Sequence, residues 1–301
     1  MKWKLGQKPT KPATERQLPT VQIRKLTNKA EILSYLEQRR SYAVTAIAHL
    51  EPGFPEISKW FVALNGENFA LCLISRSMSP SYVLTMGNEL TLDALLRTTP
   101  LPGEAFITCQ PEHLDTVERY YELEWHFLMK RMVATRESFT PAAEEAIRLR
   151  PAQVNELNRL YKEHSSNVFS ARQIRRGVYY GIWRDGQLVA VAGTHLISPT
   201  YGIAYVGNVL THPAYRNQGL ATICTSAVTT DLLDYCTEVV LNVEPQNRPA
   251  VQAYASLGYK DDCLIVEAIG RRKSFVGAIV TNLWKKLGLS PKYEERMETD
   301  G

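Results

Sequence analysis

Hydrophobic and polar positions in residues 178–258 follow the two periods of regular secondary structure. Alternation at every second residue predicts strands, and apolar residues three or four positions apart predict helices. The resulting order is three strands, a helix, a short buried strand, a second helix and a final strand, which indicates an α/β domain with a mixed sheet. Asp185-Gly186 suits the turn of a hairpin between the first two strands, because both residues tolerate positive φ. The predicted elements before the last strand cover residues 178–184, 187–193, 203–211, 220–232, 239–243 and 249–257.

The first half of the chain repeats part of this pattern. Two strand-like runs flank Asn65-Gly66, which is a second hairpin signal. The stretch QPEHLDTVERYYELEW at 110–125 also aligns with EPQNRPAVQAYASLGY at 244–259, at a constant offset of 134 residues. Nothing like RNQGLA at 216–221 occurs in the corresponding stretch, so we predict a degenerate copy of the domain that has lost this loop. The matched positions are Pro111 and Pro245, Val117 and Val251, Tyr120 and Tyr254, Leu123 and Leu257, and Trp125 and Tyr259.

In the stretch THPAYRNQGLATICTSAV at 211–228, a strand stops at a proline and a helix begins a few residues later. The start of a helix presents unpaired backbone N–H groups and the positive end of the helix dipole, and such a place attracts phosphate. Gly219 would let the backbone approach an anion without a Cβ, and Arg216 adds a fixed positive charge with several donors. The loop matches neither the P-loop nor the G-x-G-x-x-G pattern. Taken alone, R-x-x-G-x-A favours an ordinary helix start.

A second motif downstream, NRPAVQAYASLGY at 247–259, changes that interpretation. Acyl-CoA sites of the GNAT superfamily of N-acyltransferases combine R-x-x-G-x-G/A after the fourth strand with N-x-x-A-x-x-x-Y-x-x-x-G-[FY] after the fifth. The chain resembles this superfamily over residues 143–269, and its tandem arrangement resembles that of glycine N-acyltransferase-like proteins. The resemblance implies a GNAT acyltransferase fold and acyl-CoA, most often acetyl-CoA, as co-substrate. The matching positions are Arg216, Gly219 and Ala221 in the first motif and Asn247, Ala250, Tyr254, Gly258 and Tyr259 in the second.

The resemblance also implies roles for residues around the thioester. The backbone of residues 216–221 would wrap the pyrophosphate, the backbone of residues 209–211 would pair with the pantetheine arm, and Tyr254 would donate to the CoA sulfur as general acid or thiolate stabiliser. Each position has a structural alternative, because Tyr254 can pack in the core, Asn247 can cap a helix, and residues 209–211 are ordinary strand formers. The cofactor-binding positions that the resemblance implies are Val209, Leu210, Thr211, Arg216, Asn217, Gln218, Gly219, Leu220, Ala221, Asn247 and Tyr254.

The catalytic base is not evident from the sequence. Glu244 and His195 are the nearest titratable residues, although a carboxylate after a strand and a histidine on a hairpin are both ordinary structural features. Deprotonating a lysine at pH 7 costs about 4.6 kcal/mol, against about 1 to 1.4 kcal/mol for an α-amine, so a site without an evident carboxylate favours an α-amine. We therefore predict direct transfer of an acetyl group to a primary amine of a small molecule, amino acid or peptide. A protein that binds acyl-CoA for regulation or interaction, without turnover, is the alternative.

The acceptor pocket is expected to come from the early helices of the second half, including FSARQIRRG at 169–177, with the first half packing around it. Arg172, Arg175 and Arg176 can meet an acidic acceptor in such a pocket. They can equally form a solvated helix face, and the sequence favours this second interpretation.

Composition narrows the class of protein further. A length of 301 residues suggests two domains, and 45% hydrophobic residues, 22% charged residues and a mean hydropathy of -0.23 describe a globular chain without a membrane span. A net charge of +4, spread along the chain, argues against nucleic-acid binding. Five scattered cysteines favour a reducing cytoplasm and no metal. No apolar leader follows the basic N-terminus, so we expect a cytoplasmic protein.

The C-terminal segment lies beyond the region of resemblance. Apolar residues between Phe275 and Leu287 share one face of an expected amphipathic helix. We expect this face to dock on the first half or on a second subunit, as in a homodimer, rather than on an anionic membrane, because the acidic residues near the C-terminus would be repelled by anionic lipid. The predicted organisation is a flexible basic arm at 1–19, a degenerate GNAT-like domain without phosphate loop at 20–136, a catalytic GNAT domain at 143–269, and an amphipathic helix with an acidic tail at 270–301.

Overall fold

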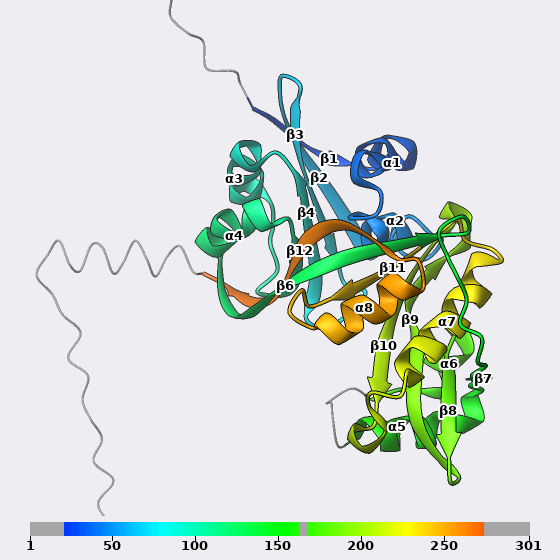
Figure 1. Ribbon diagram of the computed structural model, residues 1–301. Coiled ribbons are helices and arrows are strands. Elements are labelled where there is room, and N and C mark those ends of the chain that lie inside the picture. Colours follow the sequence, from blue (N-terminus) through cyan, green and yellow to red (C-terminus); the bar gives the residue numbers. More distant parts are fainter. Residues whose placement is uncertain (1–20, 163–167, 274–301) are drawn as a thin grey trace, which may run out of the picture.

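The computed structural model describes residues 21–162 and 168–273 of the chain. Its strands are β1 (Gln22–Leu26), β2 (Ser58–Asn65), β3 (Asn68–Ser75), β4 (Ser81–Gly87), β5 (Glu104–Cys109), β6 (Tyr121–Thr135), β7 (Ile147–Arg148), β8 (Tyr180–Arg184), β9 (Gln187–Ser198), β10 (Ile203–Thr211), β11 (Glu238–Val243) and β12 (Lys260–Arg272). All twelve form one sheet in the order β1-β2-β3-β4-β5-β12-β6-β11-β10-β9-β8-β7 (Figure 1). Among these described strands, only β4 with β5 and β10 with β11 pair in parallel. The predicted α/β class with a mixed sheet is confirmed.

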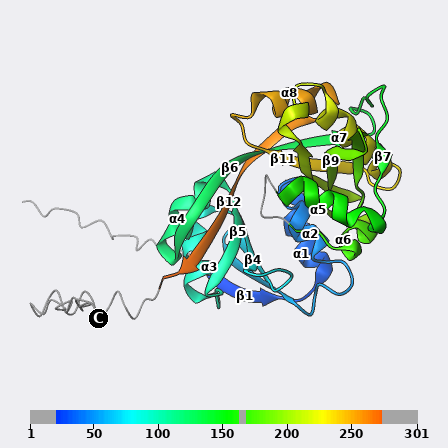
Figure 2. The same cartoon turned by 90° about the horizontal axis from the view of Figure 1, so that it is seen from below.

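Helices cover both faces of the sheet in each half (Figures 1 and 2). They are α1 (Lys29–Leu36), α2 (Val44–Ala48), α3 (Glu89–Thr98), α4 (Leu114–Tyr120), α5 (Val154–Lys162), α6 (Ala171–Arg176), α7 (Leu220–Leu233) and α8 (Arg248–Ser256). In the second half α7 and α8 pack on one face, and α5 and α6 pack on the other. The core beneath α1 and α2 extends to Ile203 and Val240 of the second half, so these two helices lie at the junction of the halves.

The two halves have the same order of elements. The series β1-α1-α2-β2-β3-β4-α3-β5-α4-β6 is followed by β7-α5-α6-β8-β9-β10-α7-β11-α8-β12. The sequence offset of 134 residues holds for the last helices, since α4 begins at Leu114 and α8 at Arg248, and it places Tyr120 and Tyr254 alike. The correspondence ends there, because the chain enters β6 at Tyr121 whereas α8 continues beyond Tyr254.

The last strand of each half is exchanged with the other half. β6 pairs with β11 of the second half, and β12 pairs with β5 of the first. The exchanged strands also pair with each other along most of their length, and Figure 2 shows them crossing together from one half to the other. The predicted domains at 20–136 and 143–269 are each one continuous stretch of sequence. In the sheet, however, each contributes one strand, β6 or β12, that pairs with the other half.

Both predicted hairpins are present. Asp185 and Gly186, with φ of 51° and 74°, connect β8 to β9 as the pattern predicts. In the first half the turn consists of Gly66 and Glu67 rather than of Asn65 and Gly66, because Asn65 is the last residue of β2. Gly66 has φ of 61°, so the glycine takes the first central position of the turn, where a positive φ is required.

Two predictions concern residues outside the described ranges, namely the basic arm at 1–19 and the amphipathic helix between Phe275 and Leu287. Where the tail was expected to begin, the sheet continues, because β12 runs to Arg272. None of the helices in the described ranges is long and apolar enough to cross a membrane.

Candidate functional site

Strands β10 and β11 separate halfway along β10. Their parallel pairing ends at Val206 and Leu241, after which β10 continues along β9 and β11 continues along β6. A β-bulge in β10 lies at this point, where Asn208 has a φ of 51°. The backbone of residues 207–211 therefore keeps β9 on one side but has no ladder with β11 on the other. Such a gap leaves backbone donors and acceptors for a ligand to use.

The segment after β10 leads directly into the start of α7. A tight turn at Pro213–Tyr215 is followed by Asn217 and Gly219, both with positive φ, at 62° and 73°. Gly219 is the N-cap of α7, no side chain caps the helix, and its first turn contains no acidic residue. A Cβ at Gly219 would meet no atom within 4 Å, so the conformation rather than crowding calls for glycine. The first N–H groups of α7 are thus open to an anion.

Arg216 stands beside this helix start with its charge available. Its Nε donates to the backbone oxygen of Thr211 at 3.3 Å, and the side chain is exposed. Asn217 and Gln218 are exposed as well, while Leu220 is buried beneath them. The predicted phosphate loop therefore has the geometry that an anion site needs.

The corresponding helix of the first half is built differently. Asn88 caps α3, and its Oδ1 accepts hydrogen bonds from N and Oγ1 of Thr91, both at 3.1 Å. Glu89 adds a negative charge in the first turn. These features satisfy the donors of α3 and repel an anion.

Tyr254 shares a core with residues from the strand gap and the helix start. Its ring is 7% exposed and belongs to the same apolar cluster as Leu220 and Val209. Within the described part of the chain its hydroxyl makes no hydrogen bond, and burial raises its pKa to about 12. The hydroxyl of Tyr120, its counterpart, instead donates to Asp93, with the backbone oxygen and Oδ1 both at 3.0 Å. Of these two tyrosines, Tyr254 is therefore the one whose hydroxyl can donate to a ligand.

The other residues predicted to bind acyl-CoA pack into the core, and some of them have polar groups without a hydrogen-bond partner among the described residues. Val209 and Leu210 pack their side chains into the cores on opposite faces of the sheet, so only their backbone can serve a ligand. The Oγ1 of Thr211 is buried and has no partner among the described residues. Asn247 caps α8, because its Oδ1 accepts from the backbone N–H of Ala250 at 3.3 Å.

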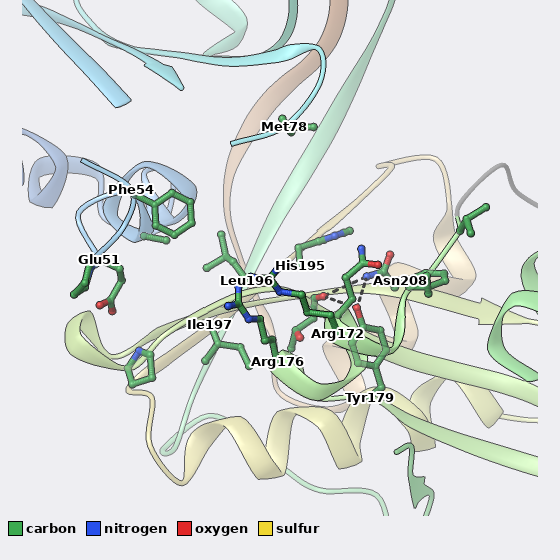
Figure 3. Close-up of a pocket in the computed structure, with 18 residues that line it drawn as sticks. Glu51, Phe54, Met78, Arg172, Arg176, Tyr179, His195, Leu196, Ile197 and Asn208 are labelled. Atoms are coloured by element: carbon green, nitrogen blue, oxygen red, sulfur yellow. Dashed lines mark hydrogen bonds between the residues drawn. The ribbon is translucent and has the colours of Figure 1, made fainter. Parts of the chain in front are cut away.

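A cavity of about 910 Å³ lies at the junction of the two halves. The second half contributes residues from α6, β9 and the bulge of β10, and the first half contributes the segment after α2 and the loop before β4. Figure 3 shows Glu51, Phe54 and Met78 of the first half across from residues of the second. The labelled second-half residues of the lining are Arg172, Arg176, Tyr179, His195, Leu196, Ile197 and Asn208.

His195 connects this cavity with the strand gap. A Cβ on Gly207 would lie 2.0 Å from Nε2 of His195, so the imidazole rests directly on β10 where the gap begins. The ring is accessible from the cavity but surrounded by protein, and this burial, with the charge of Arg131 as a second cause, lowers its pKa to about 4. His195 is therefore neutral at pH 7 and can accept a hydrogen bond.

A polar network around the buried Arg131 lies next to His195. The His195 ring packs edge-on against Tyr205, at 4.8 Å between centroids, and the guanidinium of Arg131 lies 4.9 Å from the Tyr205 ring. Arg131 donates from Nε to Oδ1 of Asn242 at 2.6 Å, and Asn242 donates to Glu267 at 2.6 Å. Burial raises the pKa of Glu267, opposed by Asn242 and Arg131.

Sequence reasoning missed this network. Arg131 lies on β6 and Glu267 on β12, the two exchanged strands, so their proximity depends on pairing across the halves. The available signal was a charged residue beside or within an apolar run, since Arg131 directly precedes residues 132–134 and Glu267 lies between Val266 and Ala268. Glu244, in contrast, is exposed in the turn after β11, where its backbone oxygen accepts from Asn247 at 2.9 Å, and it is not part of the cavity lining.

Comparisons with known proteins agree with this geometry. Residues 143–259 match the model of the Acetyltransferase (GNAT) family. A Drosophila protein of known structure is 14% identical and superposes with a TM-score of 0.60, covering 83% of this chain and 98% of that chain. A GCN5-related N-acetyltransferase from Sphaerobacter thermophilus is 12% identical with a TM-score of 0.50, covering 85% and 97%.

These matches establish the GNAT fold that the motifs predicted. No curated protein matches the chain. These matches do not test the predicted likeness to glycine N-acyltransferase-like proteins, which stays a prediction.

Proposed function

We propose that this protein is an N-acyltransferase that transfers an acyl group, acetyl in the simplest case, directly from acyl-CoA to a primary amine. One observation carries the proposal: the gap between β10 and β11 runs from the uncapped start of α7 to the wall of the cavity at Asn208. A donor laid along β10 would meet an acceptor in the cavity. The similarity of residues 143–259 to the GNAT acetyltransferase family supports this assignment.

The donor half of the reaction uses the backbone of the second half. The pyrophosphate of acyl-CoA would accept from the N–H groups of residues 219–221, with Arg216 adding its charge. The pantetheine arm would pair with residues 207–211, and the unpartnered Oγ1 of Thr211 offers it a further hydrogen bond. A backbone N–H at the bulge would polarise the thioester carbonyl, an effect of about 2.7–4 kcal/mol per donor in other enzymes.

The acceptor half uses the cavity. The amine nitrogen attacks the thioester carbon, the C–S bond breaks, and the amine proton must leave nitrogen. His195 is neutral and lies on Gly207, so its imidazole can accept the hydrogen bond of the attacking amine and pass the proton to water. Tyr254 would donate a hydrogen bond to the departing thiolate.

The first half, in this proposal, is a copy that has lost the phosphate loop and now walls the acceptor cavity. Titration of the full-length protein with acetyl-CoA in a calorimeter should give one site per chain. Arg216→Glu should abolish that site, whereas reversing a charge in the first half, as in Arg97→Glu on α3, should leave it intact. Two sites per chain would contradict this assignment.

Turnover itself is tested by incubating the pure protein with acetyl-CoA and a panel of primary amines while free thiol is measured. Thiol release that depends on the amine, with the acetylated amine identified by mass spectrometry, is the expected result. Tight binding of acetyl-CoA without turnover of any amine would instead support the alternative, a protein that binds acyl-CoA for regulation.

A further inference from the structure

The cavity at the junction carries an excess of positive charge. Its lining contains two guanidinium groups, of Arg172 and Arg176, and one carboxylate, of Glu51. That carboxylate is already engaged, because it accepts from Oγ of Ser198 at 2.6 Å and from N and Oγ1 of Thr200 at 3.2 and 2.7 Å. Neutral donors thus hold this carboxylate, and in the described ranges it forms no ion pair with either arginine, so the lining keeps an excess of one positive charge.

Arg172 and Arg176 are also available to a ligand. In the described ranges neither guanidinium forms an ion pair or a hydrogen bond. The two arginines are four positions apart on α6, a spacing at which like charges repel. The helix that carries them is held firmly by the cap from Ser170, by the buried Ile174, and by Gly177, where a Cβ would lie within 2.7 Å of its neighbours. Two exposed, unpaired cations on a firmly held helix at the edge of a cavity can receive an anion.

The same cavity borders the proposed reaction centre. Asn208, at the bulge of β10, and His195, which rests on Gly207, both belong to its lining. Figure 3 shows the two arginines and His195 within this one cavity. A small molecule that occupies the cavity can therefore touch the arginine pair and the reacting end of the strand gap together.

We propose that the acceptor amine carries an oxyanion, a carboxylate or a phosphate, which Arg172 and Arg176 hold while the amine faces His195 and Asn208. The proposal rests on the acyl-transfer function proposed above. A guanidinium presents paired donors that match the oxygens of carboxylate and phosphate, so it selects this group over a neutral amide or hydroxyl. The anion would offset the repulsion between the two arginines.

The experiment compares acceptors that differ only in the anion. The pairs are β-alanine with β-alaninamide and 2-aminoethyl phosphate with ethanolamine, and kcat/KM is referred to the concentration of neutral amine. The wild-type protein should prefer at least one anionic member by about 10-fold or more. The double variant Arg172→Gln, Arg176→Gln should lose that preference through the acceptor KM, with the KM for acetyl-CoA unchanged. Arg175→Gln, on the same helix but outside the cavity lining, is the matched control.

The outcomes separate this proposal from the one on which it rests. If β-alanine is the preferred acceptor, the arginines bind a carboxylate, and if 2-aminoethyl phosphate is preferred, they bind a phosphate. Equal turnover of neutral and anionic amines, or a preference that survives the double variant, overturns the anion site and leaves the acyl-transfer function standing.

If no amine turns over, acyl transfer fails and binding decides the anion site. The CoA-loaded protein is then titrated with β-alanine and with 2-aminoethyl phosphate, and ligand binding is followed by NMR. Binding that the double variant abolishes, with an unchanged near-UV circular dichroism spectrum, supports the site, and no binding of either probe overturns it. If the double variant does not fold, the single variants are compared in the same way.

Discussion

Replacing Tyr254 by phenylalanine tests the donor side of the mechanism most directly. The pKa of Tyr254 is raised to about 12 by burial, whereas a thiol titrates near 8.5, so full proton transfer to the departing thiolate would be uphill by roughly 5 kcal/mol. The hydroxyl therefore acts as a hydrogen-bond donor to a charged sulfur. Such a bond is worth about 1.5–3 kcal/mol, which corresponds to a loss of about 10- to 150-fold in kcat.

The acetyl-CoA KM should change little, since the bond is formed as sulfur becomes charged. Stability should also change little, because the hydroxyl has no hydrogen-bond partner among the described residues. The assay is thiol release under saturating amine, with thermal unfolding in parallel. Tyr120→Phe is the control: it removes the donor to Asp93 and should lower the unfolding free energy by about 0.5–1.5 kcal/mol without changing kcat. An unchanged kcat in Tyr254→Phe, or a loss confined to the acetyl-CoA KM, would refute the reasoning.

Three further outcomes are expected. Arg216→Ala should raise the acetyl-CoA KM by about 10-fold without lowering kcat, because it removes a charge-assisted contact to phosphate rather than a group at the thioester; steady-state kinetics check this, and a fall in kcat alone would contradict it. Arg131→Met should lower the unfolding free energy by about 1–3 kcal/mol, because it leaves Oδ1 of Asn242 and the backbone oxygen of Ser41 without the donor they have in the wild type, and denaturant unfolding measures this. The pKa of His195 is lowered to about 4 from 6.5, so the folded state binds fewer protons than the unfolded state in that interval, and stability should fall as pH drops from about 6.5 to about 4. Denaturant unfolding of the wild type and of His195→Gln across this pH interval isolates the contribution of His195 to stability. Because His195 is exposed to the cavity, this contribution should be smaller than the full pKa shift implies. The same pH dependence of stability in both proteins would contradict the prediction.

Local features of this protein could be predicted from its sequence because they depend on neighbouring residues. Asp185 and Gly186 make the expected hairpin turn, and the helix start at Gly219 has the open geometry that the loop suggested. Long-range features could not be predicted in this way. The strands that carry Arg131 and Glu267 have apolar patterns that suit several partners, so nothing in either pattern specifies pairing across the halves.

The acceptor cavity was only partly predictable for the same reason. Residues 169–177 were expected to line it, and Arg172 and Arg176 do so; both are also exposed, as the solvated helix face that the sequence favoured requires. Their function depends on where the segment after α2 lies, and that segment is more than a hundred residues away in the chain. The spacing of residues along α6 does not show which segment of the first half lies across the cavity from it.

The exchange of β6 and β12 gives this single chain the architecture of a strand-swapped dimer. Two identical single-domain chains that traded their final strands would form the same sheet, with two equivalent sites related by a twofold axis between the traded strands. When the two copies are joined in one chain, their sequences can differ. One copy can then keep the acyl-CoA site while the other lines the cavity. The covalent link also fixes the ratio of the copies at one to one. A chain cut between residues 136 and 143 would therefore yield two fragments that are inactive apart and regain activity only on reassembly.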